Sequence, residues 1–268
     1  PMGSTVSGRD GYARKSFSRY FQFTYTNAAE YKFNIANDHH FTVLLGEESI
    51  ISKSSGFGVF TDGHSDIRQL RLDQGVNVSI SDISDSRSET AFNSYFLNLN
   101  YDWNEKYYLD ATVRRDGSSK FAPDTRWATF WSVGAMWNIY KEKFMNEIDW
   151  INALSLKVSY GTTGNSSIGN YAFYGLLGSG NPYNGQGTIG ISQPSNYNLT
   201  WETVKSFDVG ISTRLFDRLN LNVDFYDKRT ENMLLSIPYS YTTGYSSGLG
   251  NIGSMANTGV DIDVKVDI

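Results

Sequence analysis

Short runs of alternating apolar and polar residues recur along this chain, and they constrain its fold more than any other feature. In 97–103 (LNLNYDW), Leu97, Leu99, Tyr101 and Trp103 alternate with polar residues. The same period recurs at 107–113, 154–160, 207–215, 219–225 and 260–268, and more loosely at 20–35 and 41–51. Successive side chains of a strand point to opposite faces, so the pattern predicts an all-β, antiparallel structure of about ten strands.

The two faces of these predicted strands differ consistently in chemistry. One carries Leu, Val, Ile, Phe, Tyr and Trp, and the other carries Asn, Asp, Ser, Thr, Lys, Arg and Gly. A soluble β-sandwich buries its apolar face in a core, whereas a transmembrane barrel turns it towards lipid. Alternation alone therefore leaves both folds open.

The lengths of the connections favour the barrel. Short turns are predicted at 36–40, 103–106 and 216–218, an intermediate connection at 140–153 contains a predicted short helix (141–150), and long loops are predicted at 52–90, 116–126, 161–199 and 236–258. Successive connections of an antiparallel sheet fall at opposite ends, so the short and long ones segregate. Short periplasmic turns and long extracellular loops are typical of outer-membrane barrels.

Aromatic residues gather near the short turns. Tyr101, Trp103 and Tyr107 flank one turn, Trp137 and Tyr140 lie near the next, and Phe216 lies near another. Rings collected at one level are expected of a girdle at the membrane–water interface.

Composition excludes several classes of protein. The net charge of −5, with both signs interspersed, lacks the basic face of a nucleic-acid binder, and the absence of Cys excludes disulfides and thiolate metal sites. No stretch approaches the roughly 20 apolar residues of a membrane helix. Residues 1–16 form a poorly defined lead-in without a signal peptide, and the chain ends within a predicted strand. We therefore expect residues 1–268 to be part of one larger β-barrel domain.

Several longer motifs resemble a known family. The segments YFLNLNYDWNEKYYLDATVRRDGSSKFAP, RWATFWSVGAMWNIYKEKFM, LSLKVSYGTTGNSSIGNY, LTWETVKSFDVGI, LNLNVDFYDKRTENML and NTGVDIDV resemble, in order and spacing, the C-terminal half of SusC/RagA-family TonB-dependent transporters. The resemblance implies a 22-stranded barrel in the bacterial outer membrane, with a plug domain that this chain lacks. It also implies a SusD-like lipoprotein lid, the TonB complex as the partner that acts through the plug, and oligosaccharides or peptides as cargo. A soluble, glycan-binding β-sandwich is the alternative.

The sequence offers no strong catalytic or metal motif. Asp62, His64 and Asp66 alternate in a polar loop, and His39 and His40 lie in a predicted turn. A metal needs ligands that converge from several segments, so this pattern is weak evidence for one. We therefore predict a transporter rather than an enzyme, with no catalytic residue, no metal and no cofactor.

Candidate contact residues follow from strand phase and loop position. The residues predicted to face the lumen are Asp110, Lys157, Asp208, Arg214 and Asp224. At the end of the strand that begins at Tyr107, Arg114 keeps the polar phase, Arg115 faces outwards at headgroup height, and Asp116 starts the bend. Arg114, Asp116 and Arg126 are predicted to hold loop, plug or lid contacts. The loop tyrosines predicted to touch cargo, lid or other loops are Tyr174, Tyr183, Tyr197, Tyr239, Tyr241 and Tyr245. The motif Trp201-Glu202-Thr203, which begins a strand after a long loop, is predicted to be a structural anchor at the extracellular rim.

Spin labels distinguish the two predicted folds. Labels at Leu97, Leu99, Leu219 and Val223 should be accessible to lipid-dissolved oxygen in a barrel, because these side chains then face the bilayer. In a sandwich the same labels lie in the core and should be shielded, and that result would rule out the barrel.

Overall fold

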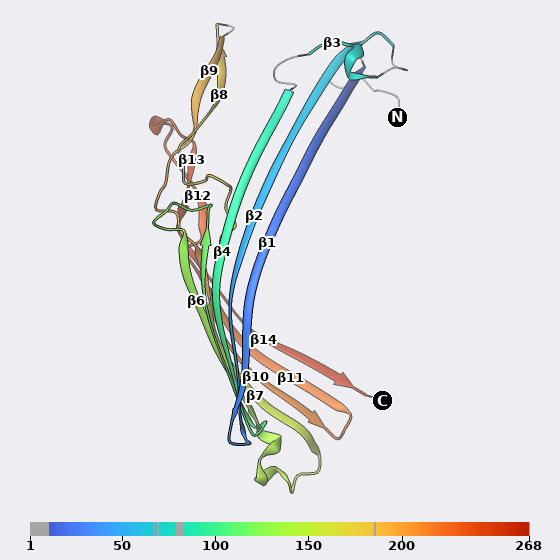
Figure 1. Cartoon of the computed structure of the whole chain (residues 1–268), viewed down its shortest axis with the longest axis vertical. Helices are drawn as coiled ribbons and strands as arrows, with labels where there is room; N and C mark the ends of the chain where they lie inside the picture. Colours follow the sequence, from blue (N-terminus) through green and yellow to red (C-terminus); the bar gives the residue numbers. More distant parts are fainter. Residues whose placement is uncertain (1–10, 67, 69, 79–82, 185, 268) are drawn as a thin grey trace. The chain divides into compact units, whose positions relative to one another are not determined.

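The computed structural model describes residues 11–66, 68, 70–78, 83–184 and 186–267, and most of them lie in antiparallel strands (Figure 1). The chain divides into two compact units, residues 1–24 with 50–91 and residues 25–49 with 92–268. None of the helices within the described ranges is long and apolar enough to cross a membrane. The all-β, antiparallel fold predicted from the alternation is confirmed.

The main sheet has ten strands, paired in the order β1-β2-β4-β5-β6-β7-β10-β11-β14, with β3 on β2. Their bounds are β1 Tyr12–Ile35, β2 His39–His64, β3 Gly75–Asn77, β4 Ile83–Trp103, β5 Tyr107–Ser118, β6 Trp127–Asn138, β7 Ile151–Asn165, β10 Glu202–Leu215, β11 Leu219–Glu231 and β14 Ser254–Val266. Two separate hairpins are β8 Leu176–Tyr183 with β9 Gln186–Gln193, and β12 Leu234–Pro238 with β13 Ser247–Asn251. The single-turn 3-10 helices are η1 Leu72–Gln74, η3 Ile139–Lys141, η4 Lys143–Met145 and η5 Tyr241–Thr243.

The smaller unit contains the N-terminal part of β1, the C-terminal part of β2, β3, η1 and the start of β4. Here β2 continues to His64 and β4 begins at Ile83, so the loop predicted at 52–90 is shorter than expected at both ends. Aromatic pairs link the strands, Tyr12 with Phe60 at 5.6 Å between ring centroids and Phe17 with Phe57 at 5.9 Å.

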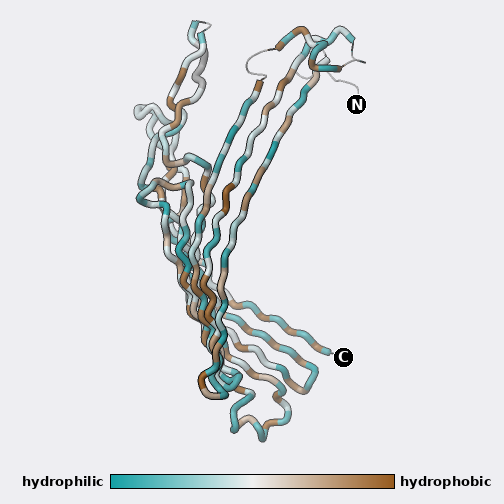
Figure 2. Tube along the Cα trace, viewed as in Figure 1, coloured by the Kyte–Doolittle hydropathy of each residue, from teal (hydrophilic) through white to brown (hydrophobic). Residues whose placement is uncertain are grey.

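In the larger unit, strand register separates an apolar face from a polar face. On β4 and β5, Leu97 lies opposite Val113, and Leu99 lies opposite Ala111. The residues between them pair on the other face, where the Asn98 side chain donates to the Thr112 hydroxyl (2.8 Å). Figure 2 shows the same alternation of hydropathy along β14, which leads to the C-terminus, and along the strands beside it. The apolar face is bare, with 44% of Leu97, 48% of Val113 and 66% of Ile262 exposed. This unit therefore needs apolar surroundings.

The short turns of the larger unit lie at one end, the lower end in Figure 1. Asn104 and Glu105 adopt φ angles of 54°, and Phe216 and Asp217 adopt 54° and 56°. Non-glycine residues rarely enter this left-handed region, and here they close three-residue turns between paired strands. The predicted short turns are confirmed. The helix expected near 141–150 consists of η3 and η4, two 3-10 turns.

The rings predicted to gather near the short turns do stack there. Centroid distances are 5.4 Å for Trp103 with Tyr107, 6.3 Å for Tyr107 with Trp137, and 5.8 Å for Trp150 with Phe216. Glu142, between η3 and η4, makes hydrogen bonds to polar atoms of this ring cluster. Its carboxylate accepts from the Tyr107 hydroxyl (2.6 Å), the Trp137 indole N–H (3.2 Å) and the Lys106 ammonium (3.2 Å).

The Glu142 carboxylate makes the order of this ring cluster depend on pH. The hydrogen bond from Tyr107, followed by those from Trp137 and Lys106, lowers the pKa of Glu142 from its ordinary value. The stabilisation of the fold by the ionised Glu142 carboxylate is therefore complete above the unfolded pKa of about 4.3, and it is lost as the pH falls through the lower folded pKa. The ¹⁹F resonance of 5-fluorotryptophan at Trp137 should shift only below about pH 4.3, and Glu142→Gln should remove that step. A step near neutral pH, or one of equal size in Glu142→Gln, would contradict this assignment.

Candidate functional site

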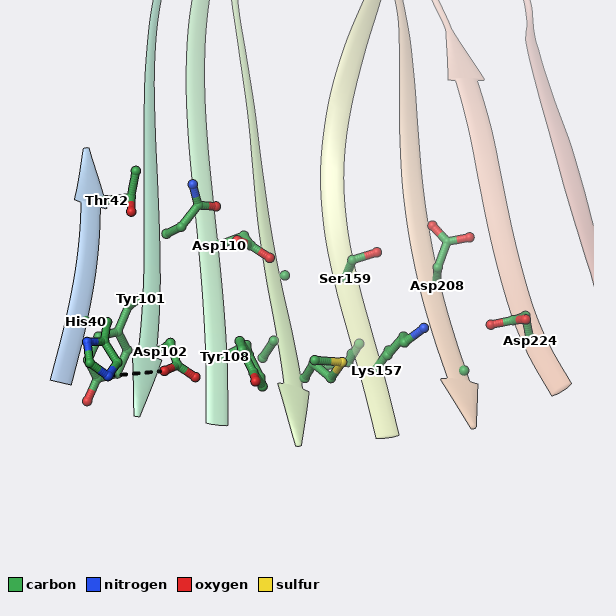
Figure 3. Close-up of a pocket in the computed structure, with 16 residues that line it drawn as sticks. His40, Thr42, Tyr101, Asp102, Tyr108, Asp110, Lys157, Ser159, Asp208 and Asp224 are labelled. Carbon is green, nitrogen blue, oxygen red and sulfur yellow. Dashed lines mark ion pairs between the residues drawn. The ribbon is translucent and has the colours of Figure 1, made fainter. Parts of the chain in front are cut away.

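A hollow on the polar face of the larger unit gathers predicted site residues from neighbouring strands (Figure 3). Its volume is about 480 Å³, and its lining includes His40, Thr42, Asn100, Asp102, Tyr108, Asp110, Gly134, Met136, Lys157, Ser159, Asp208, Gly210 and Asp224. Register explains the convergence. Asp110 lies opposite Gly134, Gly134 opposite Ser159, and Ser159 opposite Asp208. Lys157 lies opposite Gly210, which in turn lies opposite Asp224.

Two glycines leave room for this hollow. A Cβ on Gly134 would lie 3.8 Å from the Ser159 Cβ and 4.0 Å from an Asp110 carboxylate oxygen. At Gly210 a Cβ would collide with the Asp224 carboxylate, which lies over the glycine. A side chain at Gly210 would therefore displace the Asp224 carboxylate, whereas a Cβ at Gly134 would make ordinary van der Waals contacts at the floor of the hollow. These glycines are absent from the predicted site residues, because strand phase identifies a face but not a depression in it.

The hollow is acidic and accessible to water. It combines four aspartates with Lys157 and His40. His40 Nε2 lies 4.0 Å from an Asp102 oxygen, the contact dashed in Figure 3. Such a surface can hydrogen-bond hydroxyl or amide groups and attract cations. Within the described ranges no group of three or more His, Asp or Glu side chains is placed to hold a metal ion.

Arg214 lies elsewhere. Its guanidinium donates to the Asp217 carbonyl (2.8 Å) within the short turn between β10 and β11. It therefore caps a turn and does not line the hollow that contains the other predicted lumen residues.

Arg114 and Asp116 form a polar network further along the same face. Arg114 Nε donates to buried Asp116 (2.7 Å), and another guanidinium nitrogen donates to the Ser94 hydroxyl (2.8 Å) and lies 3.7 Å from Glu48. The guanidinium also lies over the Phe96 ring, 5.8 Å from its centroid. The network ties β2, β4 and β5 together.

Arg126 contributes through its backbone. Its carbonyl accepts from the Trp201 indole (2.9 Å) and from the Ser118 amide (3.1 Å). Its Nε atom is buried without a hydrogen-bond partner within the described residues.

The long connections of the larger unit share a hydrophobic core. The buried members are Phe121, Ala122, Phe130, Ile168, Ala172, Phe173, Leu199 and Trp201. Trp201 is 4% exposed and contacts the rings of Phe121 (5.3 Å) and Phe130 (5.7 Å). Trp201 is therefore packed in this core directly before β10 begins, and its role as an anchor at the extracellular rim stays a prediction. We call this packed region, residues 119–126, 166–201 and 232–253, the loop lobe.

Side-chain amides hydrogen-bond to backbone carbonyls within the loop lobe. Gln193 Nε2 donates to the carbonyls of Ala172 and Tyr174, both at 2.8 Å. Asn196 donates to the Leu249 carbonyl (2.9 Å), and Asn251 donates to the Thr200 carbonyl (2.8 Å). These bonds satisfy backbone groups that strands would otherwise pair, so the lobe is an ordered structure rather than three independent loops.

The predicted tyrosines separate into different environments. Tyr174 and Tyr197 form an edge-to-face pair at 6.2 Å and both contact buried Phe173. Tyr183 and Tyr241 are 81% and 86% exposed. The remaining two lie close to their own hairpin, where the Tyr239 ring lies over Gly248 and the backbone amide of Tyr245 donates to the Thr243 hydroxyl. The structure thus brings together only Tyr174 and Tyr197.

The histidines make structural contacts. His39 stacks on Trp103 at 5.6 Å, and His40 hydrogen-bonds Asn34 (2.9 Å). In the smaller unit, both ring nitrogens of His64 face carbonyl oxygens, those of Gly11 (3.1 Å) and Arg71 (2.8 Å).

Comparison with known proteins identifies one family. The family described as "TonB dependent receptor-like, beta-barrel" matches residues 2–267. TonB-dependent receptor P26 of Formosa agariphila is 34% identical over 248 residues, covering 89% of this chain and 25% of that protein. TonB-dependent receptor SusC of Bacteroides thetaiotaomicron is 32% identical, covering 66% of this chain and 18% of that protein. The chain spans about a quarter or less of the length of these relatives.

Solved structures agree with the family match. The chain superposes on a structure of the RagAB peptide transporter with a TM-score of 0.88 and 38% identity, covering 95% of this chain and 28% of that one. The siderophore receptor PirA from Acinetobacter baumannii shares the fold at 15% identity and a TM-score of 0.60. These relatives are named as receptors and importers, not as enzymes.

Gly164 tests the contact between sheet and lobe. A Cβ at Gly164 would collide with the ring of Phe130, which is buried against Trp201 and has little room to move. Gly164→Val should therefore cost about 1–3 kcal/mol in the free energy of unfolding, measured by urea titration of the full-length protein in vesicles. Gly169→Ala is the control, because its Cβ would meet open space. Equal stability of the two variants would contradict the packing described.

Proposed function

Because the chain belongs to the TonB-dependent receptor-like β-barrel family and resembles its SusC/RagA members, we propose that it forms part of the wall and mouth of an outer-membrane nutrient transporter. The observation that carries the proposal is a single sheet with two different faces. One face is bare and apolar, and the other is polar and hollowed. A wall between lipid and an aqueous passage needs both.

The strands suit this position energetically. In a bilayer every backbone polar group needs a partner inside the protein, which paired antiparallel strands provide. The bare apolar residues then contact lipid rather than water. A soluble β-sandwich, the alternative from sequence, would require a second layer over this face, and family membership excludes it.

The proposed cargo is an oligosaccharide or a peptide. Residues 158–201 and 232–260 contain no charged side chain, and they include the Tyr174–Tyr197 pair. These two segments offer the termini of a short peptide no ionic partner, so they favour a neutral oligosaccharide. The RagAB structures, titled as a peptide importer, favour a peptide. The two cargo classes can be separated experimentally.

The proposed partners act at the two ends of the passage. A SusD-like lipoprotein would cover the loop lobe, and the TonB complex would act through a plug domain. Support comes from the likeness to SusC and RagAB, and from the lobe itself, whose packed core offers a stable surface for docking.

Removing the tyrosine pair tests the cargo site. Tyr174→Ala with Tyr197→Ala should weaken cargo binding about tenfold, equivalent to about 1.4 kcal/mol, because both rings pack on Phe173. The backbone beneath them is held by Gln193, which donates to the Tyr174 carbonyl, and by the Asn196 amide, which donates to the Phe173 carbonyl. Binding is measured by calorimetry on the full-length protein, with neutral oligosaccharides and with short peptides in separate titrations. We expect the larger loss with the oligosaccharides.

Tyr183→Ala is the matched control, because this ring lies at the end of β8 and is 81% exposed, whereas Tyr174 and Tyr197 pack on Phe173. An equal loss in Tyr183→Ala, or none in the double variant, would contradict the assignment of the cargo site. Growth of a deletion strain on each cargo class tests the transporter itself, whichever residues bind cargo.

A further inference from the structure

Arg115 is an outward-facing cation without a carboxylate partner in the described part of the chain. It shares the face of Leu109 and Val113 on β5, at the end of that strand's apolar run. Two other cations on this face, Lys205 and Arg229, have carboxylate partners. Lys205 lies 2.7 Å from a Glu231 oxygen, and Arg229 lies 3.1 Å from an Asp227 oxygen. The Arg115 guanidinium is therefore available to bind an anion that does not belong to the sheet.

An aromatic stack fixes the position of Arg115. Its guanidinium carbon lies 5.8 Å from the centroid of the Trp127 ring, within the range of a cation–π contact. Trp127 lies against Gly117, where a Cβ would come within 2.8 Å of the indole. Tyr95 stacks on Trp127 at 6.1 Å, with 22° between the ring planes. The stack restrains the cation while leaving its N–H groups able to bind an anion.

An apolar hollow adjoins the same stack. Its volume is about 430 Å³, and it is lined by Asn27, Ala28, Ala29, Leu45, Gly46, Glu47 and Tyr95. Small residues create the space, and Leu45 is 61% exposed at its edge. Tyr95 belongs to both features, so the hollow and the Arg115 cation are parts of one continuous surface.

We propose that Arg115, Trp127, Tyr95 and this hollow bind a membrane phospholipid. Arg115 donates to the headgroup phosphate, for which a guanidinium provides two parallel N–H groups. One acyl chain lies in the hollow against Ala29 and Leu45. The Glu47 carboxylate at the margin, which accepts from Asn27 (3.4 Å), disfavours a doubly charged phosphomonoester. The expected ligand is therefore a phosphodiester lipid. The proposal requires an apolar face in contact with lipid and is independent of the cargo.

Native mass spectrometry of the full-length protein in neutral detergent tests the site. Wild-type protein should retain added phosphatidylethanolamine, and Arg115→Gln should reduce its apparent affinity about tenfold. Ala29→Phe fills the hollow and should also weaken retention, without removing the charge. Arg229→Gln is the matched control, because this outward cation already has Asp227 as its partner, and it should bind as wild type does. The heat-dependent shift of each variant in gel electrophoresis verifies that the barrel is folded.

Three comparisons identify the group that is bound. Diacylglycerol, which lacks the phosphate, should bind weakly to wild type and should not distinguish Arg115→Gln from it. Inorganic phosphate at equal concentration should not displace the phospholipid. A phosphomonoester lipid should bind no better than phosphatidylethanolamine. The proposal is overturned if Arg115→Gln retains phosphatidylethanolamine as wild type does, if Arg229→Gln loses it equally, or if any of these three comparisons gives the opposite result.

Discussion

Hydrogen bonding between neighbouring antiparallel strands is the constraint on which the rest of the structure depends. Each strand of the main sheet obtains its backbone partners from the strands beside it, and in lipid no solvent can replace them. Because pairing fixes register, it also fixes which side chains meet. A shift of one residue would move Asp110, Lys157 and Asp208 to the apolar face. Both faces therefore depend on the same ladder of bonds.

On the polar face, the glycines shape the surface as much as the charged side chains do. Gly134 and Gly210 leave the hollow open, whereas Gly46 and Gly164 accept the rings of Phe96 and Phe130. Phe130 then joins the core that contains Trp201, so one glycine couples the sheet to the loop lobe. The loop lobe can hold Tyr174 and Tyr197 in place because its backbone groups are bonded by the amides of Gln193, Asn196 and Asn251. Preorganised rings lose less conformational freedom on binding than mobile ones.

Much of this architecture could be predicted from the sequence alone. Alternation of period two identified the strands and the polar phase of Asp110, Lys157, Asp208 and Asp224, which do line one hollow. Loop position identified Tyr174 and Tyr197 but could not separate them from Tyr183 and Tyr241. Arg214 has the strand phase of the lumen-facing residues, yet its guanidinium donates to the Asp217 carbonyl in its own turn. Phase is a local property, whereas the contacts of a long side chain depend on what lies nearby.

The sequence by itself determined which segments form strands and which face of each strand is polar. It also determined the short turns, the aromatic cluster near them and the family. These depend on spacing along the chain, because the two-residue period and the turn residues act over a few positions. Only the tertiary structure decided where the polar face is hollow, which loops share a core and that Arg115 stacks on Trp127 beside an apolar hollow. Each of these depends on residues far apart in sequence, as with Asn27, Leu45, Tyr95 and Arg115. Strand pairing brings them together, and no local pattern records that outcome.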